Sequence, residues 1–308
     1  MKVQKKKIAS ASILVFLVLF YPILVKADVE IVLKKTFIES LKDKVTIGTP
    51  FIIEKSHDRP NSAKLDGDLH IAGISNDIKL PVVAEIMNAK FFKDAVDLVN
   101  KIRGTNTPIQ LAGAWRLWCE HGGDDLQEQG MNFAIENSNP PHVFQVHPVT
   151  KIGDINLLDT LVPIDGYKFK DADTAFARYE NIRCRLSENS AKGTVKIHTV
   201  GAGYNYVEFN IELNETPFQV EDGCFVFCKV LDLEGELLNY KTRMAFVKDS
   251  PPELKVRTMN KGDRLHVIGI PRISLKLVSW RISQANQRPE VLDWQLPYEM
   301  VIVGVIED

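Results

Sequence analysis

Alternating titratable residues in the segment 65–71 (Leu-Asp-Gly-Asp-Leu-His-Ile) have types and spacing that could support chemistry. Asp66, Asp68 and His70 occupy every second position of this segment. Since alternate residues of a β-strand share a face, we expect Asp68 and His70 to point the same way, opposite to the apolar side chains between them. Carboxylates beside an imidazole can bind a divalent cation or transfer a proton.

Glu85 and His147 complete this candidate site. Glu85 interrupts an apolar strand pattern (Pro-Val-Val-Ala-Glu-Ile-Met), where a carboxylate is costly unless it is paired or exposed. His142 and His147 are five residues apart, so a straight strand sends them to opposite faces and only one can join the site. The sequence therefore predicts a metal or acid–base site that suits Zn²⁺ or Mn²⁺ and could activate water, made of Asp68, His70, Glu85 and His147.

The alternative interpretation of these residues is structural. Asp66 and Asp68 are natural turn residues before a strand, and His147, which precedes Pro148, could be a hydrogen-bonded histidine at a sheet edge. A compact ligand spacing such as His-Glu-x-x-His does not occur in the sequence.

A second candidate site lies in the segment 255–288, which holds eight basic residues and one acid. Basic side chains interleaved with aromatic ones on a β-surface can bind single strands or anionic glycans. The residues that could form such a ligand face are Trp115, Trp118, Arg264, Arg272, Lys276, Trp280 and Arg281. The alternative is a solvated outer face, with the two first-named tryptophans packed in a core.

The predicted elements of the first half follow the order of an OB fold, a five-stranded Greek-key barrel with a helix between its third and fourth strands. A short helix is predicted at 36–44, a longer one at 91–102, and strands at 45–54, 68–74, 80–87, 110–119 and 142–152. We expect an OB-like domain over residues 28–155, a linker at 156–167 and a second domain at 168–308.

The second half reads as a β-rich barrel or sandwich after a helix at 172–181. Strands are predicted at 182–186, 194–199, 204–213, 224–231, 238–247, 265–270, 275–282 and 300–305. The segment 67–74 resembles the segment 262–270 with one inserted residue. A duplication of two OB-like domains would explain this echo, but it is short, and a shared turn-into-strand pattern is the favoured explanation.

Residues 65–90 and 142–152 resemble a domain of secreted bacterial proteins that has an Asp-x-Asp-x-His strand, a Val-Ala-Glu-Ile strand and a closing His-Pro-Val. The residues that carry this resemblance are Asp66, Asp68, His70, Glu85, His147, Pro148 and Val149. It covers less than half of the chain and implies a domain boundary more than an activity. Through Asp66-Gly67-Asp68 the chain is also similar to staphylococcal-nuclease-like OB domains, although the arginines and carboxylates that such nucleases need are not identifiable at matching positions.

The N-terminus has the pattern of a secretory signal: a basic start, an uncharged apolar run at residues 8–25, and Val25-Lys26-Ala27 as a cleavage site. Cleavage before Asp28 predicts a periplasmic or secreted protein, and an uncleaved membrane anchor is the alternative. Removing residues 1–27 takes away five lysines, which leaves 33 basic against 40 acidic residues and a net charge of −7. General nucleic-acid binding is therefore not expected.

The four cysteines allow disulfides in an exported protein. Cys224 and Cys228 are about 13 Å apart along a straight strand, beyond the about 7 Å between Cα atoms that a disulfide needs. The favoured bridge joins Cys184 to one of these two, and buried thiols are the alternative.

These observations favour an exported, non-enzymatic protein that binds a ligand or partner whose identity the sequence does not specify. The alternative is a metal-dependent hydrolase, similar to a phosphodiesterase or nuclease, that uses the carboxylates and histidines of the first domain.

Overall fold

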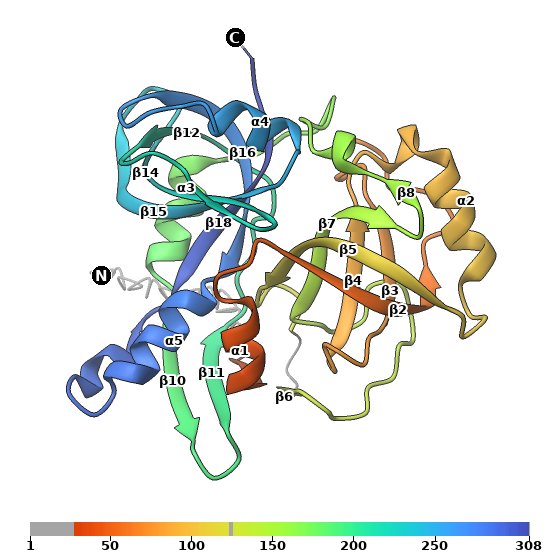
Figure 1. Cartoon of the computed structure of the whole chain (residues 1–308), viewed down its shortest axis with the longest axis horizontal. Coiled ribbons are helices and arrows are strands. Elements are labelled where there is room, and N and C mark those ends of the chain that lie inside the picture. Colours follow the sequence, from red (N-terminus) through yellow and green to blue (C-terminus); the bar gives the residue numbers. More distant parts are fainter. Residues whose placement is uncertain (1–27, 123–125, 308) are drawn as a thin grey trace, which may run out of the picture.

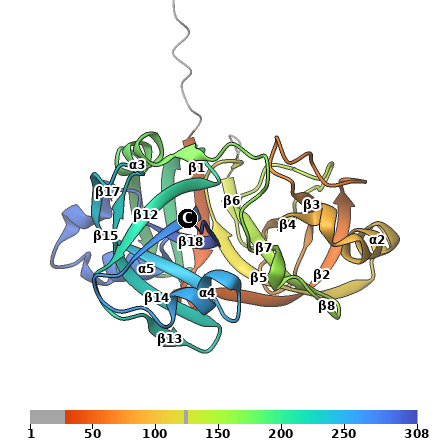
Figure 2. The same ribbon diagram turned by 90° about the horizontal axis from the view of Figure 1, so that it is seen from above.

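The computed structural model describes residues 28–122 and 126–307. Strands contain 44% of the residues and helices 19%, which confirms the predicted mainly β fold. The strands form two closed five-stranded barrels. Figures 1 and 2 show the two barrels side by side, the first coloured orange to green and the second cyan to blue. The predicted signal sequence lies outside the described residues.

The first barrel has five strands in the order β4-β3-β2-β5-β7, closed by parallel pairing of β4 with β7. These strands are β2 (Thr46–Ser56), β3 (Leu69–Ile74), β4 (Pro81–Ile86), β5 (Pro108–Leu117) and β7 (Phe144–Ile152). The short β8 (Ile155–Asn156) extends this sheet beside β7. The predicted long helix is α2 (Lys93–Ile102), preceded by η1 (Ala89–Phe91), and it lies between β4 and β5 in the chain.

The second barrel repeats the same connectivity. Its strands follow the order β14-β15-β18-β16-β12, closed by pairing of β12 with β14. They are β12 (Val207–Leu213), β14 (Gly223–Leu231), β15 (Leu237–Val247), β16 (Arg264–Ile273) and β18 (Tyr298–Val305). In both barrels the third and fifth strands pair in parallel, all other pairs are antiparallel, and a helix, here α4 (Pro251–Val256), precedes the fourth strand. The edge strands β9 (Lys170–Asp171) and β13 (Phe218–Val220) complete this sheet.

A third sheet joins the two halves of the chain. Its order is β17-β10-β11-β1-β6, so the first described strand pairs with strands from both halves. These strands are β1 (Asp28–Lys34), β6 (Leu126–Glu128), β10 (Arg183–Asn189), β11 (Thr194–Val200) and β17 (Asp293–Gln295). The short helix α1 (Lys35–Leu41) follows β1 and packs against α5 (Leu275–Gln284). The remaining helices are α3 (Ala172–Glu180), η2 (Leu158–Thr160) and η3 (Pro289–Leu292).

The prediction of a strand at 275–282 is wrong, because this segment is the helix α5. Its buried residues Leu275, Val278 and Ile282 recur at the three- and four-residue spacing of a helix. The expected bridge from Cys184 is also wrong, since all four cysteines are free, buried thiols. Cys184 lies on β10 of the third sheet, whereas Cys224 and Cys228 lie on β14 of the second barrel.

The two echoing segments occupy different places in the barrels. Residues 67–74 lead into β3, the second strand of the first barrel, whereas residues 262–270 lead into β16, the fourth strand of the second barrel. The two similar segments therefore do not occupy equivalent positions of the two barrels. Within the described residues, no helix is long and apolar enough to cross a membrane.

Candidate metal centre between the barrels

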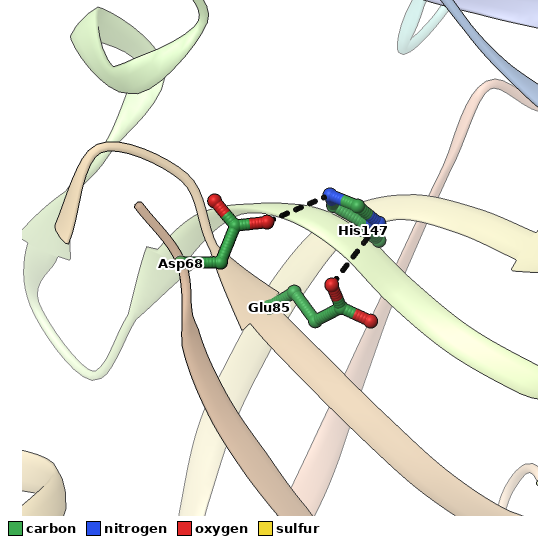
Figure 3. Close-up of side chains that lie close together, drawn as sticks. All are labelled: Asp68, Glu85 and His147. Carbon is green, nitrogen blue, oxygen red and sulfur yellow. Dashed lines mark ion pairs between the residues drawn. The ribbon is translucent and has the colours of Figure 1, made fainter. Parts of the chain in front are cut away.

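Asp68, Glu85 and His147 of the first barrel meet in one buried cluster, as Figure 3 shows. Their candidate ligand atoms all lie within 4.8 Å of one another, and all three side chains are buried. Nε2 of His147 is 3.5 Å from Oδ2 of Asp68, and Nδ1 of the same ring is 3.5 Å from Oε2 of Glu85. The imidazole thus has one carboxylate at each of its two nitrogens.

The strand register brings these residues together. His70 of β3 stands directly opposite Glu85 of β4, and β4 runs parallel to β7, which carries His147. The backbone of β7 approaches β5 so closely that a Cβ atom on Gly113 would lie 2.3 Å from the carbonyl oxygen of Pro148. Only glycine fits at this position, so Gly113 permits the backbone path that places His147.

Tyr206, which immediately precedes β12, reaches this cluster from the second half of the chain. Its hydroxyl donates to Oδ2 of Asp68 at 2.5 Å, so its oxygen can accept the Nε2 proton of His147 at 2.7 Å. This arrangement assigns the proton of a neutral His147 to Nε2 and leaves a lone pair on Nδ1. Neither Nδ1 of His147 nor Oδ1 of Asp68 has a hydrogen-bond partner among the described residues.

Gln145 donates a hydrogen bond to Glu85, as Tyr206 does to Asp68. Its amide nitrogen donates to Oε1 of Glu85 at 2.6 Å and lies 3.1 Å from Nε2 of His142, while its carbonyl oxygen accepts from Arg116. Nδ1 of His142 lies 2.7 Å from the carbonyl of Pro140 and carries the proton, so Nε2 can accept from Gln145. The second oxygen of Glu85 therefore faces His147 and His70.

His70 lies at the edge of this cluster. Its Nε2 is 3.5 Å from Oε2 of Glu85 and 3.8 Å from Oδ2 of Asp66, and its ring stacks on His57 with centroids 4.9 Å apart. Both ring nitrogens are buried and lack a hydrogen-bond partner within the part of the chain that the structure describes. Oε2 of Glu85 is thus equally close to nitrogens of two histidines.

Burial and mutual charge shift the pKa values of the three buried groups. Burial raises the pKa of Asp68 to about 6. Burial also opposes ionisation of Glu85, but the nearby His147, His70 and Arg116 outweigh it and lower the Glu85 pKa to about 2. Burial alone would lower the pKa of His147, yet the carboxylates of Glu85 and Asp68 raise it above its ordinary value. The cluster therefore retains negative charge on Glu85 and attracts a proton or a cation.

A pocket of about 660 Å³ opens over this cluster. One wall comes from the first barrel, through Asp66, His70 and Glu85 and through Glu120 and His121 after β5. The facing wall comes from the segments 167–171 and 204–206, which belong to the second half of the chain. His70 and Glu85 are thus shared by the cluster and the pocket wall.

The residues of the predicted ligand face do not share a surface. Trp115, Trp118 and Arg272 are fully buried, and Arg281 is 9% exposed and donates to the carbonyl of Gln295. Arg264 and Lys276 are exposed but form ion pairs with Glu212 and Asp43, respectively. Trp280 is 45% exposed on α5, a helix and not the strand that the sequence suggested.

Sequence reasoning missed the residues that orient the cluster: Tyr206, Gln145 and Arg116. Tyr206 lies 59 residues beyond its partner His147, and nothing in its local sequence marks it. Gln145 could have been suspected, because it is a polar residue two positions before His147 on the same strand face.

Comparisons of the sequence with protein families and with curated proteins find no match.

Proposed function

We propose that the first barrel binds a divalent transition-metal ion through Asp68, Glu85 and His147, with His70 as a further ligand at the pocket edge, and that an external ligand reaches the ion through the pocket. One observation carries this proposal. Each carboxylate accepts a hydrogen bond from a neutral donor, Tyr206 for Asp68 and Gln145 for Glu85, and the second oxygen of Glu85 lies 3.5 Å from the unprotonated Nδ1 of His147. Outer hydrogen bonds of this kind orient metal ligands in proteins.

The distance between His147 and Glu85 supports a shared cation better than a direct hydrogen bond. Nδ1 of His147 is 3.5 Å from Oε2 of Glu85, beyond the usual hydrogen-bond range of about 2.7–3.2 Å. Ligand atoms bound at about 2.1 Å to one tetrahedral ion lie about 3.4 Å apart. Two carboxylates with one or two imidazoles suit Zn²⁺ or Mn²⁺.

The topology of the first barrel supports an OB fold. Its first strand pairs with the second and fourth, its third and fifth strands close the barrel in parallel, and α2 stands between the third and fourth. OB folds bind ligands on the face of strands two and three and on the loops that join strands one to two and four to five. The first-barrel wall of the pocket is made of these four parts.

We further propose that the protein is exported and works as a ligand-binding protein in the periplasm or outside the cell. The basic start, the apolar run and the Val-Lys-Ala cleavage pattern support cleavage before Asp28. Residue Asp28 is also where β1 begins, so cleavage there would leave the described fold whole. Determination of the N-terminal residue of the mature protein tests this point, and an N-terminus at Met1 would contradict it.

A second candidate function is metal-dependent hydrolysis. It is favoured by the position of Glu85 and His70, which belong both to the cluster and to the pocket wall. An ion held there could keep a coordination position open to water, which the ion would activate for attack on a substrate in the pocket.

Elemental analysis of the protein, purified without chelator, tests the metal proposal. We expect about one equivalent of zinc or manganese in the wild type and loss of this metal in the His70→Ala/His147→Ala double variant. The matched control is His198→Ala/His266→Ala, which removes two histidines on β11 and β16 outside the cluster and should keep the metal. The proposal would be overturned if the wild type contains no metal and its melting temperature is unchanged by added Zn²⁺ and Mn²⁺.

A further inference from the structure

The pocket above the cluster is polar and partly aromatic. Its second wall carries the rings of Tyr167, Phe169 and Tyr204, all of which are half-buried. Tyr167 and Phe169 pack edge to face, with centroids 5.2 Å apart. A volume of about 660 Å³ lies within the range of about 300–1,000 Å³ that is usual for sites of small ligands.

The charge of the pocket disfavours a polyanionic ligand. Four carboxylates line it, those of Asp66, Glu85, Glu120 and Asp171, against two lysines. One of these lysines, Lys170, is paired with Asp171 at 2.8 Å. Phosphate-rich strands need a surplus of basic side chains, and a bound divalent ion would still leave the other carboxylates around it.

Glu120 and Asn205 supply polar contacts on the pocket wall. The side chain of Glu120 is 22% exposed, and its buried Oε2 lies 3.6 Å from Nη2 of Arg116, which leaves Oε1 as the oxygen that a ligand can reach. Oδ1 of Asn205 is buried and has no hydrogen-bond partner within residues 28–122 and 126–307, so this side chain offers a ligand its amide nitrogen. A ligand with hydroxyl groups can donate to such a carboxylate and accept from such an amide.

We propose that this pocket binds a neutral oligosaccharide. Hydroxyl groups of the sugar would donate to Glu120 and accept from the amide nitrogen of Asn205, and the apolar faces of its rings would pack on Tyr167 and its aromatic neighbours. The inference rests on the proposed function only in using the same pocket, because the residues named for the sugar are not those named for the metal.

Binding to an array of neutral and acidic glycans, with a fluorescently labelled oligothymidylate measured in parallel, tests the proposal. We expect the wild type to bind neutral glycans. The isosteric variant Glu120→Gln and the variant Tyr167→Leu should each weaken this binding on the order of tenfold, and Tyr240→Leu should leave it unchanged. Tyr240 is the matched control, because it is 76% exposed and lies on β15 away from the pocket.

The outcomes separate this inference from the metal proposal, since metal content is measured on the same samples. Glycan binding that depends on Glu120 and Tyr167 supports the inference whether or not metal is present. Failure to bind neutral glycans, binding that both variants leave intact, or binding of oligothymidylate in place of glycan overturns it. Retained metal together with absent glycan binding would leave the metal proposal standing alone.

Discussion

Arg116 and Arg272 occupy equivalent positions in the two barrels, and each donates a hydrogen bond to the strand that carries the other. Nε of Arg116 on β5 donates to the carbonyl of Pro271 at 2.8 Å, and Nη1 of Arg272 on β16 donates to the carbonyl of Trp115 at 3.0 Å. Both arginines lie on the fourth strand of their barrel, opposite a residue of the fifth strand, Gln145 or Glu299. The barrels thus pack about a pair of reciprocal contacts.

The two arginines differ in their other contacts. Arg116 holds Gln145, which in turn holds Glu85 of the candidate metal centre. Arg272 instead pairs with Glu299 at 2.7 Å, lies over the ring of Trp115 and donates to the carbonyl of Val45. The same position therefore supports a polar site in one barrel and the interface between the barrels in the other.

Replacement of Arg272 by methionine should destabilise the protein strongly. The substitution leaves the buried Glu299 with Arg243 as its remaining arginine partner and removes the donor to the carbonyls of Val45 and Trp115. Removing one partner of a buried ion pair costs about 3–5 kcal/mol, and Arg243 should keep the loss near the lower end of this range. Urea unfolding measures the change. Arg264→Met is the control, because Arg264 forms an exposed ion pair whose loss should cost at most about 1 kcal/mol. Equal midpoints for the two variants would show that the buried pair contributes nothing beyond a surface one.

Tyr206→Phe should weaken metal binding without unfolding the protein. The variant removes the hydroxyl that fixes Asp68 and sets the tautomer of His147, and loss of such an outer partner typically reduces metal affinity about 10- to 100-fold. Competition with a chromogenic chelator measures the affinity. Tyr179→Phe is the matched control, since Tyr179 is also buried but donates to the carbonyl of Tyr204. Similar metal affinities in both variants would show that Tyr206 does not contribute to metal binding.

Metal binding should stabilise the protein more as the pH rises. The pKa values of Asp68, about 6, and of His147 are both raised in the folded protein. Stability contributed by their protonation is present at low pH and is lost as the pH rises through these folded-state values. The pKa of Glu85 is instead lowered to about 2, so its ionised carboxylate favours the folded state. This contribution to stability is lost as the pH falls below the unfolded value of about 4.5.

A cation competes with the protons on Asp68 and His147, so the increase in melting temperature caused by Zn²⁺ should grow from about pH 5 to about pH 8. Thermal melts with and without Zn²⁺ across this range measure the increase. A shift that stays constant, or that shrinks with pH, would contradict a site built from these groups.

The first barrel was more predictable from sequence than the rest of the chain. Its strands are short runs rich in apolar and β-branched residues that end at clear turn signals, so their number and order follow from local pattern. The alternation around Asp68 and the isolated charge of Glu85 also pointed to the site. Its orientation depends on Tyr206, however, which reaches the site through packing between the barrels, and no local pattern encodes such a contact.

The segment at α5 shows where local pattern is ambiguous. Leu275 and Leu277 flank Lys276, and Val278 and Trp280 flank Ser279, as in a strand, yet Leu275, Val278 and Ile282 also fit a helical face. Packing against α1 selects the helix. A short apolar segment that satisfies both periods can be assigned only when its tertiary partner is known.

The four cysteines yield a last prediction, which bears on compartment as well as fold. All are buried free thiols, and burial raises the pKa of Cys119 and of Cys184 to about 12, so little reactive thiolate is present at neutral pH. Ellman's reagent should therefore label the native protein negligibly and all four thiols after unfolding in urea without reductant. Release of only two thiols on unfolding would reveal a disulfide formed in an oxidising compartment.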